Sequence, residues 1–153
     1  MAGGRIVVGV DGSEPSLKAL TWAAAQAALT GDSLEAVISW EYPAAWAGMI
    51  PGGVPLQFDP EQLSGQILDA ALDATLTPEA AAGTTRTVVG GNAAQALVDA
   101  AKGAELLVVG DRGYSGFKAA VLGSVSSHVA QHAPCPVVVV RGGTESDGPA
   151  PGA

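Results

Sequence analysis

The stretch that decides the fold is Leu106-Leu107-Val108-Val109-Gly110-Asp111-Arg112-Gly113, followed after nine residues by Gly123-Ser124-Val125-Ser126. Its four leading apolar residues predict a strand that is buried on both faces. Glycines let the backbone approach a ligand closely and turn successive N–H groups toward an anion. A helix over residues 124–133 would add the positive end of its dipole. This order of strand, glycine loop, hydroxyl and helix is typical of a phosphate-binding site.

Strands and helices alternate along the rest of the chain. Apolar runs predict strands over 6–10, 34–40, 85–89, 105–109 and 137–140, and helical spacing with capping residues predicts helices over 15–30, 60–76, 93–102 and 124–133. This alternation predicts an α/β fold, an open five-stranded parallel sheet with helices on both faces. Residues 43–58 are rich in Pro and Gly and predict a long loop. We expect one domain over residues 1–141 and a disordered tail over 142–153.

Three segments would meet at one edge of such a sheet, because ligands bind beyond the carboxyl ends of parallel strands. Asp11 follows the first strand, Ser39 lies late in the second, and Gly110 ends the fourth. Ser124 is also predicted to cap the last helix. Ser126 is the sharper candidate for phosphate, because capping does not require a hydroxyl there. Arg112 could supply a charge for phosphate or simply point to solvent.

Composition and charge narrow the functional classes. The 153 residues carry a net charge of −8 and no cluster of Lys or Arg, which disfavours nucleic-acid binding. No run approaches the roughly 20 apolar residues needed to cross a bilayer, and the N-terminus lacks a signal-peptide pattern. With its single cysteine, Cys135, the chain is expected in the cytoplasm.

The same residues resemble the universal stress protein family, in its ATP-binding branch. The resemblance rests on segments 6–13, 106–113, 123–126 and 135–140. The family's nucleotide motif is Gly, two residues, Gly, nine residues, Gly, then Ser or Thr, and Gly110, Gly113, Gly123 and Ser124 meet it in full. The resemblance implies an adenine-nucleotide alpha-hydrolase-like (Rossmann-like) fold with strand order 3-2-1-4-5. One departure is Ile38, where many members of the family carry histidine.

The resemblance also implies roles for particular residues. Val10 and Asp11 would meet the adenosine, and Ser39 would line the adenine pocket. Gly110 and Gly113 would pass close to the ribose and phosphates. The triphosphate would be held by Gly123, Ser124, Val125 and Ser126. The implied cofactor is ATP with Mg²⁺ or Mn²⁺, and the implied partner is a second copy of the chain, paired through Val137 to Val140.

These observations predict an ATP-binding regulatory or sensor module in a stress response. A slow ATPase and a nucleotide-independent scaffold dimer remain alternatives. The P-loop motif G-x-x-x-x-G-K-[ST] is absent, so the lysine that neutralises phosphate in P-loop enzymes is missing. We therefore expect weak ATP hydrolysis at most, because phosphoryl transfer needs positioned charge and an oriented nucleophile. His128 and His132 share one helix face, but a packing role is favoured over a zinc site.

Overall fold

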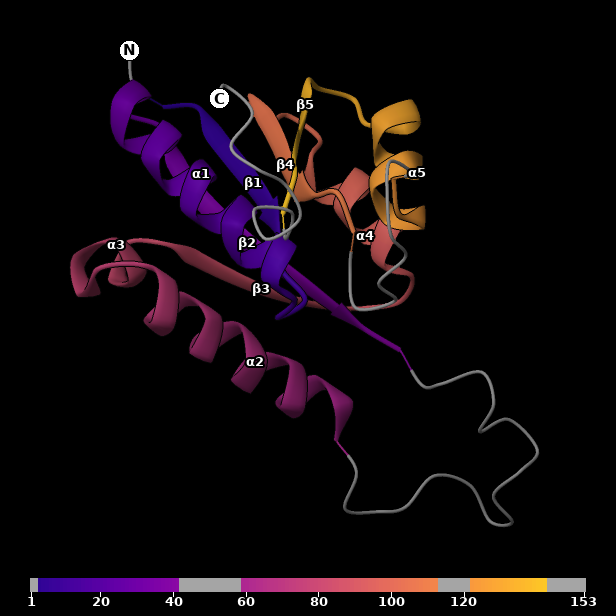
Figure 1. The fold of residues 1–153 in the computed structure, drawn as a ribbon, viewed down its shortest axis with the longest axis horizontal. Helices are drawn as coiled ribbons and strands as arrows, with labels where there is room; N and C mark the ends of the chain where they lie inside the picture. Colours follow the sequence, from indigo (N-terminus) through magenta and orange to yellow (C-terminus); the bar gives the residue numbers. More distant parts are fainter. Residues whose placement is uncertain (1–2, 42–58, 113–121, 143–153) are drawn as a thin grey trace, which may run out of the picture.

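A computed structural model describes residues 3–41, 59–112 and 122–142. Its sheet contains five strands: β1 (Arg5–Gly9), β2 (Ser33–Trp40), β3 (Thr85–Gly90), β4 (Leu106–Gly110) and β5 (Val137–Val140). All neighbouring strands are parallel, and their order across the sheet is β3-β2-β1-β4-β5. Both the open parallel sheet and its predicted strand order are confirmed (Figure 1).

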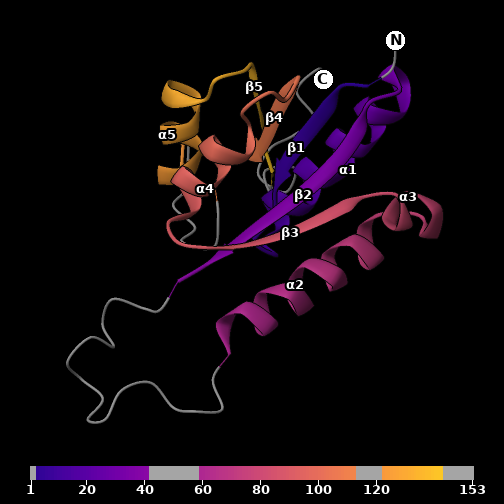
Figure 2. The ribbon, with the colours of Figure 1, turned by 180° about the vertical axis from the view of Figure 1, so that it is seen from behind.

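The described residues form five helices beside these strands: α1 (Glu14–Thr30), α2 (Pro60–Thr75), α3 (Pro78–Ala82), α4 (Ala93–Ala100) and α5 (Ser124–His132). Figures 1 and 2 show α1 and α2 on one face of the sheet and α4 and α5 on the other. The strands accordingly feed two apolar cores. Val8 and Val108 pack toward α1 and α2, whereas Val7 and Leu107 pack toward α4 and α5.

Side chains and glycines fix the ends of these helices. Asp59 accepts a hydrogen bond from Gln62 N at 3.0 Å, and Asn92 accepts one from Gln95 N at 3.0 Å, as their predicted N-cap positions require. Gly31 ends α1 in the left-handed conformation, at φ 81°. The short helix α3 was not predicted. It begins where Thr77 Oγ1 accepts a hydrogen bond from Ala80 N at 3.1 Å.

A polar network closes the amino end of the sheet. The guanidinium of Arg5 donates to Glu35 Oε1 at 2.8 Å and to the carbonyls of Ala100 and Lys102 at 2.8 and 2.7 Å. Thr87 Oγ1 donates to the other oxygen of Glu35 at 2.6 Å. Arg5 thus binds carbonyls at the C-terminal end of α4 and, through Glu35, links β1 to β2 and β3.

In the part of the chain that the structure describes, no helix combines the length and the apolar character needed to span a bilayer. Residues 143–153, the greater part of the expected tail, lie outside the described residues. Gly142, the first residue of that expected tail, is buried.

Candidate functional site

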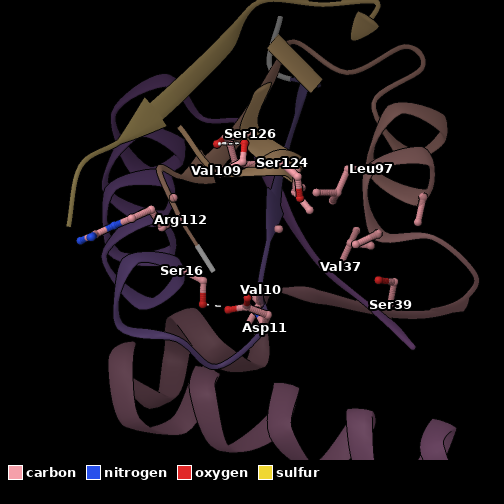
Figure 3. Close-up of a pocket in the computed structure, with 16 residues that line it drawn as sticks. Val10, Asp11, Ser16, Val37, Ser39, Leu97, Val109, Arg112, Ser124 and Ser126 are labelled. Carbon is pink, nitrogen blue, oxygen red and sulfur yellow. Dashed lines mark hydrogen bonds between the residues drawn. The ribbon is translucent and has the colours of Figure 1, made fainter. Parts of the chain in front are cut away.

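A cavity of ≈ 240 Å³ opens at the carboxyl ends of β1, β2 and β4, beside the start of α5. The predicted site residues that line it are Val10, Asp11, Ser39, Gly110, Arg112, Gly123, Ser124, Val125 and Ser126. Figure 3 shows Val10 and Asp11 on one side of this cavity and Ser124 and Ser126 on another. Gly113 lies outside the described residues. The predicted convergence of three strand ends is present in the fold.

An apolar wall completes the cavity, and the sequence did not predict it. This wall consists of Gly9, Val37, Ala93, Ala96, Leu97 and Val109. A Cβ on Gly9 would lie 2.8 Å from Leu97 Cδ1, so the glycine lets α4 pack close to β1. The wall is suited to a flat apolar group such as a nucleobase.

The turn after β1 holds the Asp11 carboxylate. Asp11 Oδ1 accepts hydrogen bonds from the backbone N–H of Ser13, at 2.8 Å, and from its hydroxyl. Ser16 Oγ accepts a hydrogen bond from Asp11 N at 3.3 Å (Figure 3). It also donates one to Ser13 O at 2.9 Å. Ser16 also lines the cavity, a role that the sequence analysis missed. The exposed Asp11 side chain is therefore oriented before any ligand arrives.

Helix α5 begins one residue earlier than its predicted N-cap, Ser124, implied. Gly123, in an extended conformation, is the N-cap, and no side chain caps the helix. Its carbonyl accepts the first helical hydrogen bond, from Ser127 N at 2.9 Å. Ser124 is thus the first helical residue rather than the N-cap, and it is exposed. Because the first N–H groups of a helix lack intrahelical acceptors, those of residues 124–126 are available at this wall of the cavity.

The Ser126 hydroxyl is used inside the protein. Its side chain is buried, and Oγ lies 3.0 Å from the carbonyl oxygen of Asp111 and 3.2 Å from that of Gly123. A hydroxyl has one hydrogen to donate. Donation to a phosphate oxygen would therefore break a bond that ties α5 to the end of β4.

The Arg112 side chain points neither into the cavity nor into solvent, the two directions that the sequence left open. Its Nη2 donates to Gly142 O at 3.1 Å, and its Nε lies 3.8 Å from Asp111 Oδ1. Figure 3 shows the guanidinium directed away from Ser124 and Ser126. Arg112 lines the cavity, but the charge of its guanidinium lies near the buried carboxylate of Asp111.

Gly110 has a structural reason to be glycine. A Cβ at this position would lie 2.7 Å from the carbonyl carbon of Pro15 and 2.8 Å from its oxygen. Any larger residue would push the end of β4 away from the start of α1. The packing against Pro15 thus requires glycine at this position, and the predicted approach of Gly110 to a ligand stays a prediction.

Within the described ranges, no group of three or more His, Cys, Asp or Glu side chains could hold a metal ion. His128 and His132 stack with ring centroids 4.3 Å apart, and His132 Nδ1 lies 3.0 Å from His128 O. Cys135 is partly buried, and burial raises the pKa of its thiol. The described residues alone therefore do not complete the ligand shell of a metal ion.

The sheet order and the position of this cavity define a Rossmann-like α/β protein. The model of the universal stress protein family matches residues 4–141, so the chain belongs to that family. A universal stress protein of Mycolicibacterium smegmatis is 35% identical over 136 residues, which cover 89% of this chain and 45% of the relative. A universal stress protein of Mycobacterium tuberculosis is 36% identical over 142 residues, which cover 89% of this chain and 47% of that relative. The chain spans about half the length of these curated relatives.

Solved structures agree on the fold. The universal stress protein UspA of Lactobacillus plantarum superposes with a TM-score of 0.66 at 24% identity, covering 90% of this chain and 97% of that one. A universal stress protein solved in complex with cAMP superposes with a TM-score of 0.62 at 30% identity, covering 90% of this chain and 95% of that one. One from Archaeoglobus fulgidus in complex with dAMP superposes with a TM-score of 0.64 at 22% identity, covering 90% of this chain and 97% of that one. Two of these three relatives are therefore bound to adenine nucleotides.

Proposed function

We propose that this chain binds ATP, together with Mg²⁺ or Mn²⁺, and acts as a nucleotide-dependent regulatory or sensor module in a stress response. The observation that carries the proposal is the cavity itself. Segments from β1, β2, β4 and α5 meet there, and the cavity combines apolar residues with hydroxyls and the first residues of α5. That combination suits a ligand with a flat base at one end and an anion at the other.

The residues present fit an adenine nucleotide in two parts. Val37 and Leu97 offer apolar contacts to a base, and Ser39 offers a hydroxyl beside them. Ser124 and the first N–H groups of α5 offer donors to phosphate. The related structures with cAMP and dAMP support the adenine part of this proposal.

The charges near the cavity support binding more than rapid catalysis. Of the described residues that line it, Arg112 is the only cation, and its guanidinium is engaged by Gly142 and Asp111. The Asp11 carboxylate adds negative charge at the rim. The charge of a polyphosphate would have to be balanced largely by the metal that accompanies it, so we expect slow hydrolysis at most.

The proposal is tested by calorimetry on the full chain with ATP and Mg²⁺. We expect a single site, and weaker binding when EDTA removes the metal. Ser124→Ala should weaken ATP binding about tenfold or more, because a hydrogen bond to a charged group contributes about 1.5–3 kcal/mol.

Ser127→Ala is the matched control, since Ser127 lies in the same helix but does not line the cavity. It should bind ATP like the unmodified chain. No heat at millimolar ATP would refute the proposal. Equal affinities of the two serine variants would remove the Ser124 hydroxyl from the site, and many turnovers of ATP in the same sample would favour the ATPase.

We also propose that the chain works as a homodimer in the cytoplasm. β5 is an edge strand, and its four valines are only partly buried, which favours pairing with a second copy. The lone cysteine is consistent with a reducing compartment.

A further inference from the structure

Gly142 does not line the cavity, but it contacts both of the segments that enclose it. The residue lies two positions after β5 and is buried. One of the two segments is the turn over residues 11–16, and the other is the end of β4 together with the start of α5. We call these the turn wall and the helix wall.

Gly142 reaches the turn wall through Pro15. A Cβ on Gly142 would lie 2.8 Å from Pro15 Cα and 3.1 Å from Pro15 Cβ. Pro15 also lies against Gly110, where an added Cβ would be 2.8 Å from Pro15 Cβ. Pro15 thus packs closely against both glycines, and the next residue, Ser16, holds the Asp11 turn.

Gly142 reaches the helix wall through Asp111 and Arg112. Its N–H donates to Asp111 Oδ1 at 3.4 Å, and its carbonyl accepts from Arg112 Nη2 at 3.1 Å. The backbone of Asp111 continues the path, because its N–H donates to Val140 O at 2.9 Å and its carbonyl accepts from Gly123 N at 2.8 Å. Gly123 is the N-cap of α5.

We propose that Gly142 is a positioning residue that sets the spacing of the two walls, so that the seating of residues 141–142 controls the affinity of the cavity for nucleotide. The inference rests on the proposed ATP site. Because coupling between two sites is reciprocal, a nucleotide in the cavity also holds Gly142 in its place. The affinity of the cavity for nucleotide is thereby linked to the C-terminal end of β5, the edge strand of the sheet.

Gly142→Ala tests the spacing, because φ at this glycine lies outside the left-handed region and alanine is penalised only by its contact with Pro15. We expect the variant to bind ATP with Mg²⁺ about 5- to 150-fold more weakly, the usual range for coupled sites. Gly83→Ala is the control, since its Cβ would meet nothing closer than 3.6 Å. Equal affinity of the two variants would overturn the inference.

Two measurements of amide hydrogen exchange by NMR complete the test. They still decide the positioning role of Gly142 if the Gly142→Ala variant is unstable or if ATP does not bind. In the unmodified chain, saturating ATP should slow exchange at the Gly142 N–H, and unchanged exchange would contradict the coupling. In ligand-free Gly142→Ala, exchange at the Gly123 N–H should rise, while that of the Gly31 N–H, bonded to Ala27 O at 2.8 Å, should not. An unchanged Gly123 rate would overturn the positioning role whether or not ATP binds.

Discussion

Ser124 and Ser126 are two residues apart, yet the fold gives their hydroxyls different roles. The Ser126 hydroxyl is buried and donates to main-chain carbonyls, so it stabilises the join between β4 and α5. The Ser124 side chain is exposed at the first helical position. We therefore expect Ser124 to contact phosphate directly, and Ser126 to act mainly by keeping the N–H groups of α5 in place.

Cys135 should be a slowly reacting thiol. Burial raises its pKa, Arg5 lowers it to a smaller extent, and Glu105 raises it again. Because only the thiolate is alkylated, the pH at which iodoacetamide reacts at half its maximal rate should lie above the value of about 8.5 for free cysteine.

Mass spectrometry of the folded chain from pH 7 to 10 measures this shift, and the chain in urea is its control. The raised pKa of Cys135 also makes the stability of the fold depend on pH. Since the fold favours the neutral thiol, the contribution of Cys135 is complete below its unfolded pKa and is lost as pH rises through the folded pKa. A folded midpoint at or below the midpoint in urea would contradict the prediction.

The glycine motif located the site from sequence but did not explain each glycine. Gly110 and Gly123 were predicted from their spacing, and both line the cavity. That Gly110 is required by Pro15, nearly one hundred residues earlier, depends on the packing of α1 against β4. The direction of the Arg112 side chain likewise depends on Gly142, a contact that sequence spacing cannot reveal.

At the scale of helices, two glycines should respond oppositely to alanine. Gly65 lies inside α2, and an added Cβ would meet only Val88 Cγ2, at 4.0 Å. Gly65→Ala should therefore raise the free energy of unfolding by about 0.5–1 kcal/mol. Gly31 has φ 81°, so Gly31→Ala should lower it by about 1–2 kcal/mol.

Urea unfolding followed by circular dichroism measures both changes. The two variants are each other's control, since both add one methyl group to a glycine at or within a helix. Changes of the same sign would contradict the conformational argument.

Helix boundaries were predictable where local chemistry decides them. Asp59 and Asn92 cap helices through hydrogen bonds to residues three positions later, which is a local pattern. α3 escaped prediction because a five-residue helix shows too little periodicity. The start of α5 was misplaced because Ser124 is a good cap by type, but the extended residue is Gly123.

For the whole molecule, pairing of β5 with a second copy predicts a dimer. Light scattering at micromolar concentration should give a mass near twice the 15.1 kDa of one chain. Leu29→Ser is the control, because Leu29 is 82% exposed on α1 and belongs to a different surface. A monomeric mass would contradict pairing through β5, and loss of the dimer in Leu29→Ser would move the interface to α1.

The arrangement of the sheet was predictable in two parts. Alternating strands and helices predicted a parallel sheet, while the strand order came from the family resemblance and is confirmed. The apolar wall contributed by α4 was not foreseen, because Ala96 and Leu97 show only ordinary helical spacing. Which helix crosses which strand is set by tertiary packing.

Because the five strands run the same way, the two ends of the sheet are chemically separate. Arg5 and Glu35 close one end, and the cavity occupies the other. The fluorescence of a label attached ahead of Arg5 should therefore not change when nucleotide is added. A fluorophore on a cysteine introduced at Arg141, whose side chain is 59% exposed, would sit beside Gly142, which we propose responds to nucleotide. The chain thus offers a silent attachment point and a reporting one at opposite ends of the same sheet.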